Sequence, residues 1–162
     1  RLRVDNGEIV FIDRLQGRIV QHLEDDVGDF VLRRADGLFA YQLAVVVDDA
    51  WQGITHVVRG ADLLASTPRQ IALQRSLGYP EPVYAHLPVA ANPAGEKLSK
   101  QTLAQALRVD QASAELVAAL RFLGQAVPGE MSRASVAEVW AWARAHWSFA
   151  AVPRQALIVL PA

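Results

Sequence analysis

The chain contains no cysteine, and only two of its sixteen basic side chains are lysines. The lack of cysteine excludes a disulfide framework and a thiolate metal site. No apolar run approaches the roughly 20 residues that a membrane-spanning helix needs, so we expect a cytoplasmic protein. A net charge of −1 supplies no overall positive field. Any contact with nucleic acid must therefore come from local basic patches.

What the chain does contain is ordinary for a globular protein. Its 162 residues are 52% apolar and 20% charged, which is enough for one domain, or slightly more, with a real core. Residues 1–5 carry neither a starting methionine nor a signal-peptide pattern, and they resemble the middle of a strand. We therefore expect the chain to be a piece of a longer protein.

Residues 1–35 are predicted to be rich in β-structure. Short apolar runs bounded by turn residues indicate strands at 8–13, 18–21 and 29–34. The acidic stretch 24–26 is interpreted as a solvated loop rather than a metal site. We predict no metal site anywhere in the chain.

The next section alternates helix and strand. Apolar residues at helical spacing predict a helix over 38–51, although the run 45–47 would also suit a strand. A strand over 54–58, a helix over 69–77 and a strand over 83–89 follow. A strand–helix–strand unit of this kind is expected to be parallel and right-handed.

Three cations lie just beyond these two strands. Arg59 follows the first strand, and the loop 92–101, which carries Lys97 and Lys100, follows the second. Because ligands of open α/β sheets collect at the carboxyl ends of strands, we expect the three cations to converge. Such a site suits a ligand that carries carboxylate and phosphate groups. Taken alone, a Lys-x-x-Lys pair is more typical of a solvated surface loop.

The remaining residues, 102–162, are predicted to be helical. One helix is expected over 113–122, and a capping box formed by Ser135 and Glu138 opens a second. Trp140 and Trp147 share the apolar face of that second helix, so we expect them to pack in the core rather than to stack on bases. His22 and His146 are interpreted as structural. The arginines that could contact phosphates are Arg108, Arg121, Arg133 and Arg144, and their spacing singles out none of them.

An ordered series of short motifs resembles the glutamyl branch of the class I aminoacyl-tRNA synthetases. The series is Tyr-Gln-Leu-Ala-Val-Val-Val-Asp-Asp at 41–49, Gln-Gly-Ile-Thr-His-Val-Val-Arg-Gly at 52–60, Thr-Pro-Arg-Gln at 67–70, His-Leu-Pro at 86–88 and Lys-Leu-Ser-Lys at 97–100. The last motif is similar to the KMSKS signature of class I, with Leu98 in place of methionine. The series covers roughly residues 36–101.

This resemblance implies an α/β fold in three parts. Residues 1–35 would be a β-rich connecting segment, and 36–101 the second half of a Rossmann-like parallel sheet with its signature loop. Residues 102–162 would form a helical subdomain. We find no equivalent of the family's HIGH-type motif, so the chain resembles the C-terminal part of such an enzyme and is expected to be inactive alone. A zinc site, where the family has one, would also lie upstream.

The resemblance also assigns candidate site residues. Tyr41 and Arg59 match residues that bind glutamate, although Tyr41 by itself would pass for a core aromatic. Lys100 matches the lysine that stabilises charge on the departing pyrophosphate. His86 is a candidate for the edge of the ATP site. The predicted ATP-binding loop consists of Lys97, Leu98, Ser99, Lys100 and Gln101.

Finer features favour one subfamily, which attaches glutamate to queuosine in the anticodon of tRNA(Asp). These features are Asp-Gly-Leu-Phe-Ala-Tyr at 36–41, Arg-Gly-Ala-Asp-Leu at 59–63, Gln101 after the signature, and a short remainder. The implied partners are L-glutamate, ATP with Mg²⁺ and queuosine-containing tRNA(Asp), and we expect a monomer. Two alternatives remain open: a fragment of a glutamyl-tRNA synthetase, and an inactive synthetase-like module that binds nucleotide or RNA.

Overall fold

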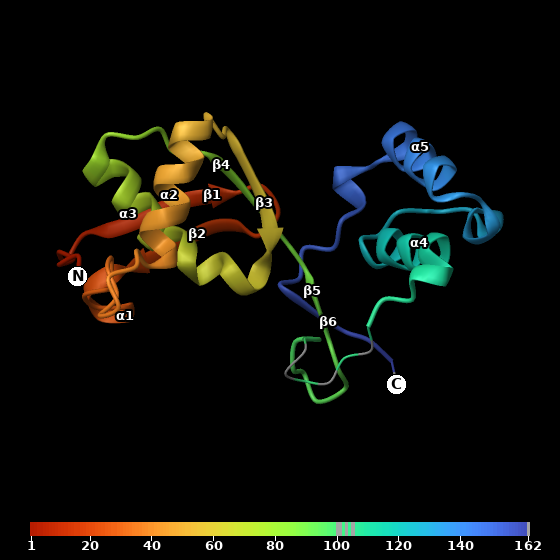
Figure 1. The fold of residues 1–162 in the computed structure, drawn as a ribbon, viewed down its shortest axis with the longest axis horizontal. Helices are drawn as coiled ribbons and strands as arrows, with labels where there is room; N and C mark the ends of the chain where they lie inside the picture. Colours follow the sequence, from red (N-terminus) through yellow and green to blue (C-terminus); the bar gives the residue numbers. More distant parts are fainter. Residues whose placement is uncertain (100–101, 103, 105, 162) are drawn as a thin grey trace. The chain divides into compact units, whose positions relative to one another are not determined.

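The computed structural model describes residues 1–99, 102, 104 and 106–161. The chain forms two compact units, Arg1–His86 and Leu87–Ala162, which are shown in Figure 1. The domain boundaries that the resemblance implied, 1–35, 36–101 and 102–162, stay a prediction.

The first unit opens with a hairpin. Strands β1 (Glu8–Asp13) and β2 (Gly17–His22) pair in antiparallel fashion, with Asp13 opposite Gly17. Because side chains alternate along a strand, Ile9, Phe11 and Asp13 all point inward and are buried. A short helix, α1 (Leu23–Asp26), follows. The predictions of strands at 8–13 and 18–21 are confirmed.

The third predicted strand, at 29–34, is wrong. Within residues 29–34, Phe30 forms one isolated β-bridge with Leu2, and Arg33 forms another with Phe39. The two bridges lie on different neighbouring segments, so neither partner runs alongside the stretch for long enough to build a ladder. An apolar run makes a strand only where such a partner exists.

The alternating part of the first unit follows the predicted order. Helix α2 (Tyr41–Gln52) comes first, and the ambiguous run 45–47 lies inside it as helix, with Val46 buried. Strand β3 (His56–Gly60), the 3₁₀ helix η1 (Ala61–Ser66) and helix α3 (Thr67–Leu77) follow. Strand β4 (Val83–Leu87) pairs with β3. The predicted α/β fold class is therefore confirmed.

The predicted strand 83–89 is in fact two strands. Strand β4 ends at Leu87, and β5 (Val89–Ala91) starts after Pro88. Proline has no N–H to donate to a ladder, which explains the interruption. This break coincides with the boundary between the two units.

Two apolar clusters hold the first unit together. Helix α3 supplies Ile71 to one cluster and Leu73 to the other, and both side chains are almost completely buried. The helix thereby joins the hairpin to α2. The buried members are Ile9, Phe11, Leu23, Ile71 and Tyr84 in the first cluster and Phe30, Val46 and Leu73 in the second.

The second unit combines a small parallel sheet with a helical pair. Strand β5 pairs with β6 (Leu157–Val159) in parallel. Helices α4 (Ala112–Phe122) and α5 (Val136–His146) lie side by side (Figure 1). Its described residues also form the 3₁₀ turns η2 (Val109–Gln111), η3 (Gly129–Arg133) and η4 (Phe149–Ala151). Its core consists of Val117, Leu120, Val127, Val139 and Ala143.

The predicted capping box at the start of α5 is confirmed. The Ser135 hydroxyl accepts from the Glu138 N–H at 3.3 Å, and the Glu138 carboxylate accepts from the Ser135 N–H at 2.8 Å. Two backbone donors that the helix leaves unpaired are thus satisfied.

The prediction that Trp140 and Trp147 pack in the core is wrong, and Trp147 lies just after the end of α5. Trp140 is 50% exposed and Trp147 is 43% exposed. The helix turns Val139 and Ala143 towards the core of the unit, and the tryptophan that packs against that core is Trp142. Trp142 also stacks on His146, with ring centres 4.8 Å apart. The apolar stripe is therefore narrower than the sequence pattern indicated.

Among the described helices, none combines the length and the apolar character needed to cross a membrane.

A glycine after α4 tests how tightly the second unit is packed. Gly124 has a φ of +75°, and a Cβ built there would collide with the carbonyl oxygen of Ala151. Gly53, after α2, has a φ of +67° but open space around it. We expect Gly124→Ala to lower the free energy of unfolding by about 3 kcal/mol or more, and Gly53→Ala by about 1–2 kcal/mol. Urea unfolding of both variants measures the difference, and equal losses would contradict the packing described here.

Candidate functional site

The site is built around the buried carboxylate of Asp13. The side chain is inward-facing at the end of β1, where the hairpin turns. Its Oδ1 accepts from the backbone N–H groups of Leu15 at 3.0 Å, Gln16 at 2.9 Å and His86 at 3.1 Å. One oxygen thus closes the turn and attaches β4 to the hairpin.

The second oxygen of Asp13 holds the ring of His86. The distance from Oδ2 to Nδ1 is 2.6 Å, and both side chains are fully buried. On the other side of the ring, Nε2 lies 3.0 Å from Nε of Arg59. A guanidinium can only donate, so Nε2 must accept and the ring proton sits on Nδ1, where Asp13 accepts it. The geometry therefore requires a neutral imidazole.

The electrostatics agree with this protonation state. Burial acts to raise the pKa of Asp13, but hydrogen bonds from the Gln16 N–H, the His86 ring and further backbone groups outweigh it and lower the pKa. Burial lowers the pKa of His86, the bond and charge of Asp13 oppose this, and the charge of Arg59 adds to the lowering. A carboxylate thus faces a neutral ring.

Arg59 is held on several sides. Its Nη2 donates to the Thr67 hydroxyl at 2.8 Å and to the Gln70 amide oxygen at 2.7 Å. Its guanidinium carbon lies 5.6 Å from the centre of the Tyr84 ring, a cation–π distance. These bonds use the hydrogens of Nε and Nη2. Among the described residues, the structure pairs no acceptor with the two hydrogens of Nη1.

A further bond links this cluster to α2. The amide nitrogen of Gln70 donates to the side-chain oxygen of Gln42 at 2.8 Å. The residue before Gln42 is Tyr41, which begins α2 and is 51% exposed. The start of α2 and Arg59 are therefore connected through one glutamine pair. The glutamate-binding roles of Tyr41 and Arg59 stay predictions.

His86 is more deeply placed than the sequence suggested. Both ring nitrogens are engaged within the first unit, and the side chain is completely buried. The structure connects His86 to Arg59, whereas a position beside ATP stays a prediction.

The signature loop is shaped by its first residues. The Asn92 side chain accepts from the Glu96 N–H and donates to the Glu96 carboxylate, each at 2.9 Å. Gly95 supports the turn with a φ of +82°. The backbone of the exposed Lys97 then forms an isolated antiparallel β-bridge with Ala91, at the end of β5. The beginning of the Lys-Leu-Ser-Lys motif is therefore anchored beside a strand.

Thr102 organises the backbone of the motif, and sequence reasoning missed it. Its hydroxyl oxygen accepts from the Ser99 N–H at 2.9 Å and lies 3.1 Å from the carbonyl oxygens of both Lys97 and Ser99. Lys100 and Gln101 lie outside the described residues. Arg59 belongs to the first unit and the loop to the second, so the expected convergence of the three cations stays a prediction.

Asp13 was also missed, although a signal for it existed. It continues the inward-facing series of Ile9 and Phe11 in an alternating strand, and a carboxylate at such a position needs partners. Thr67 and Gln70 lay within a motif that carried the resemblance, but no role was assigned to them. Their bonds to Arg59 supply that role.

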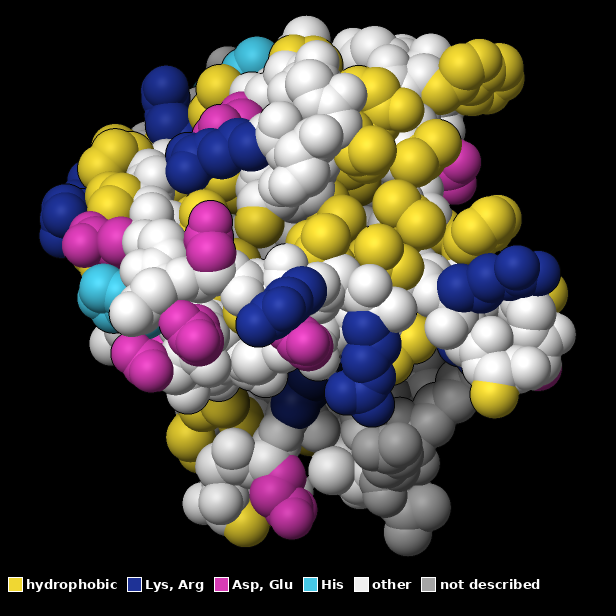
Figure 2. All heavy atoms as spheres, turned by 90° about the vertical axis from the view of Figure 1, so that its left-hand side faces the viewer, with side chains coloured by type: hydrophobic (Ala, Val, Ile, Leu, Met, Phe, Trp, Pro, Cys, Tyr) yellow, Lys and Arg dark blue, Asp and Glu magenta, His cyan; other side chains and the backbone are white. Residues whose placement is uncertain are grey.

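The described residues do not build a metal cage. Within the part of the chain that the structure describes, no three His, Asp or Glu side chains gather where they could hold an ion. Mg²⁺ commonly binds through one or two carboxylates together with substrate phosphates. Figure 2 shows acidic and basic side chains interspersed on the face that it draws, in keeping with the net charge of −1.

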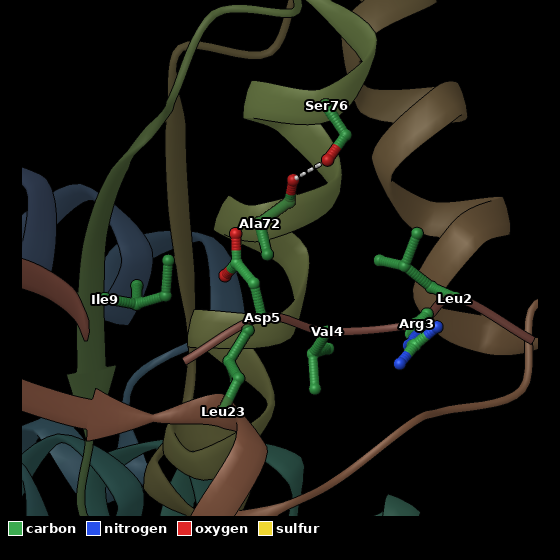
Figure 3. Close-up of a pocket in the computed structure, with 8 residues that line it drawn as sticks. All are labelled: Leu2, Arg3, Val4, Asp5, Ile9, Leu23, Ala72 and Ser76. Atoms are coloured by element: carbon green, nitrogen blue, oxygen red, sulfur yellow. Dashed lines mark hydrogen bonds between the residues drawn. The ribbon is translucent and has the colours of Figure 1, made fainter. Parts of the chain in front are cut away.

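One hollow in the first unit lies apart from these residues. It measures about 310 Å³ and is lined mainly by the N-terminal segment, α3 and the hairpin (Figure 3). The Ser76 hydroxyl in it is already bonded to the Ala72 carbonyl of its own helix at 2.8 Å. Among the described residues, no predicted site residue lines this hollow.

The neutral state of His86 predicts how stability depends on pH. Because its pKa in the folded chain lies below the ordinary value of 6.5, the unfolded chain binds more protons between the two values. We expect the free energy of unfolding to fall as pH drops below about 6.5, with a slope of at most about 1.4 kcal/mol per pH unit. The contribution of Asp13 is lost separately, below its ordinary value of 3.8.

Urea unfolding across this pH range measures the slope. His86→Gln should remove the part due to His86, and His22→Gln should leave it in place. The same slope in the wild type and in His86→Gln would contradict the assignment.

Comparison with known proteins identifies the family. Residues 1–141 match the catalytic domain of the class I tRNA synthetases for E and Q, that is, glutamate and glutamine. A glutamyl-Q tRNA(Asp) synthetase from Dechloromonas aromatica is 80% identical over all 162 residues, which are 54% of its own length. Another from Aromatoleum aromaticum is 59% identical over 150 residues, which cover 93% of this chain and 48% of that protein. The chain thus spans about half the length of the curated relatives it matches.

Solved structures agree on the fold. The chain aligns to glutamate-tRNA synthetase from Elizabethkingia anophelis with a TM-score of 0.70 and 23% identity, over 98% of this chain and 35% of that one. It aligns to a glutamate tRNA ligase from Elizabethkingia meningosepticum with a TM-score of 0.67 and 24% identity, over 93% and 33% of the two chains. By its match over residues 1–141, this chain belongs to the class I tRNA synthetases of the glutamate and glutamine group and carries part of their catalytic domain.

Proposed function

We propose that this chain is part of an enzyme that activates glutamate with ATP and transfers it to queuosine in the anticodon of tRNA(Asp). The observation that carries the proposal is the 80% identity, over all 162 residues, to a relative named glutamyl-Q tRNA(Asp) synthetase. The chain alone is expected to be inactive, because it spans only about half of that relative.

The held guanidinium of Arg59 supports the glutamate-binding part of the proposal. Bonds to His86, Thr67 and Gln70 already order the side chain, so binding a carboxylate would cost little additional conformational entropy. The hydrogens of Nη1 would donate to a glutamate carboxylate, a charge-assisted contact. Tyr41 would complete the pocket from the start of α2.

The signature loop supports the ATP-binding part. In the proposed first step, a glutamate carboxylate oxygen attacks the α-phosphorus of ATP, and the bond from that phosphorus to the β-phosphate oxygen breaks. Pyrophosphate leaves, and the positive charge of Lys100 stabilises it as it does so. Thr102, through the backbone of Lys97 and Ser99, would keep the loop in shape. Mg²⁺, entering with ATP, would neutralise part of the phosphate charge.

In the second step the acceptor group of queuosine attacks the carbonyl carbon of glutamyl-adenylate, and AMP leaves. The likeness to glutamate-tRNA synthetases of known structure, at 23–24% identity, concerns the fold and does not favour tRNA(Glu) as the acceptor.

The substrate assignment is tested with the full-length protein that carries this segment. We expect ATP, Mg²⁺ and labelled glutamate to label queuosine-containing tRNA(Asp), and not tRNA(Asp) that lacks queuosine or tRNA(Glu). Scintillation counting of precipitated tRNA measures this. Label on tRNA(Glu) alone would instead make the protein a translation synthetase, and label on neither tRNA would favour an inactive binding module.

The role of Lys100 is tested in the same full-length protein. We expect Lys100→Ala to slow glutamyl-adenylate formation by about 100- to 1,000-fold, because a charge aimed at the leaving group is lost. Glutamate-dependent exchange of pyrophosphate into ATP measures this step. Arg18→Ala, which removes an exposed ion-pair partner of Glu8, is the matched control and should leave the rate unchanged. Full activity in Lys100→Ala would remove Lys100 from the mechanism.

A further inference from the structure

We infer that Asp13 and His86 are positioning residues for Arg59: they hold its guanidinium by Nε and thereby commit Nη1 to the glutamate carboxylate. The inference rests on the proposed function for the identity of the ligand. The positioning itself rests on contacts within the first unit alone.

Asp13, His86 and Arg59 form a series of hydrogen bonds in which the first bond sets the condition for the second. The carboxylate of Asp13 accepts the proton of Nδ1 at 2.6 Å, which leaves Nε2 of His86 with a lone pair. That lone pair accepts from Nε of Arg59 at 3.0 Å. The proton on one ring nitrogen therefore decides whether the other nitrogen attracts the guanidinium or repels it.

The remaining partners of Arg59 cannot replace this contact. Thr67 and Gln70 both accept from Nη2, and the Thr67 hydroxyl also lies 3.1 Å from Nε2 of His86, but neither side chain accepts from Nε of Arg59. The Tyr84 ring, 5.6 Å from the guanidinium carbon, restrains its distance from the ring but sets no hydrogen-bond direction. The bond to His86 is the contact at Nε, and together with the two bonds at Nη2 it fixes the orientation of the planar fork.

The substitution that separates positioning from packing is Asp13→Asn. The asparagine oxygen can still accept from the N–H groups of Leu15, Gln16 and His86. Its amide nitrogen, however, would donate to Nδ1 of His86 and move the ring proton to Nε2. Nε2–H could then donate to the Thr67 hydroxyl, 3.1 Å away, but the Nε–H of Arg59 would face a donor in place of its acceptor. The variant keeps the shape of the site but exchanges donor and acceptor at the two ring nitrogens of His86.

The kinetic test uses the full-length protein and glutamate-dependent pyrophosphate exchange. We expect Asp13→Asn to raise KM for glutamate about 10- to 100-fold, since a bond to a charged group is lost, with kcat and KM for ATP nearly unchanged. In an Arg59→Ala background the same change should add no further rise, because Asp13 acts through Arg59. Val46→Ala, equally buried in the first unit but packed against Phe30 and Leu73, controls for lost stability and should leave KM for glutamate unchanged.

A second measurement on the 162-residue chain is independent of activity. Long-range ¹⁵N–¹H NMR spectra of labelled histidine should show His86 protonated at Nδ1 in the wild type and at Nε2 in Asp13→Asn. The Arg59 Nε–H signal should be protected from exchange in the wild type and lose that protection in the variant.

The outcomes separate the two proposals. A reversed tautomer with an unchanged KM for glutamate would overturn the positioning role, as would a wild-type ring protonated at Nε2. If the wild-type full-length protein shows no glutamate-dependent exchange, the proposed function fails. The NMR arm then still decides the positioning: loss of Arg59 protection in Asp13→Asn supports it, and unchanged protection overturns it.

Discussion

The hydrogen bond between Nε of Arg59 and Nε2 of His86 is the contact that joins the buried carboxylate of Asp13 to the guanidinium of the candidate site. It is possible only while the imidazole is neutral and protonated at Nδ1, a state that the buried carboxylate of Asp13 maintains. The charged guanidinium of Arg59, the neutral ring of His86 and the carboxylate of Asp13 thus form one hydrogen-bonded series. Each of them would be costly to bury without its neighbour.

Four elements contribute the side chains of that hydrogen-bonded series and its neighbours. Strand β1 contributes Asp13, β3 contributes Arg59, β4 contributes His86, and α3 supplies the two side chains that accept from Nη2. The apolar clusters set the spacing, because α3 packs against both the hairpin and α2. Three hydrogen bonds hold the guanidinium of Arg59 in this cluster, so the proposed binding of a carboxylate would cost little further side-chain entropy.

Local patterns predicted the elements well where one physical signal dominated. The alternation in β1 and the capping box at Ser135 were each sufficient, whereas the spacing in α2 left the run 45–47 open between helix and strand. Predictions failed where the outcome depended on a distant neighbour: the stretch 29–34 had no continuous partner strand. Trp140 lies on a side of α5 that the core does not cover, and Trp147 lies just after the end of that helix, so both stay partly exposed.

The sequence by itself determined the family, through ordered motifs from 41 to 100, and with it the candidate roles of Tyr41, Arg59 and Lys100. Only the tertiary structure decided what surrounds Arg59. Asp13 and His86 are 73 residues apart, and nothing local in either segment indicates the other. The physical reason is that a buried polar group must find its partner wherever the fold brings one within hydrogen-bond distance, and that distance is a property of packing rather than of spacing along the chain.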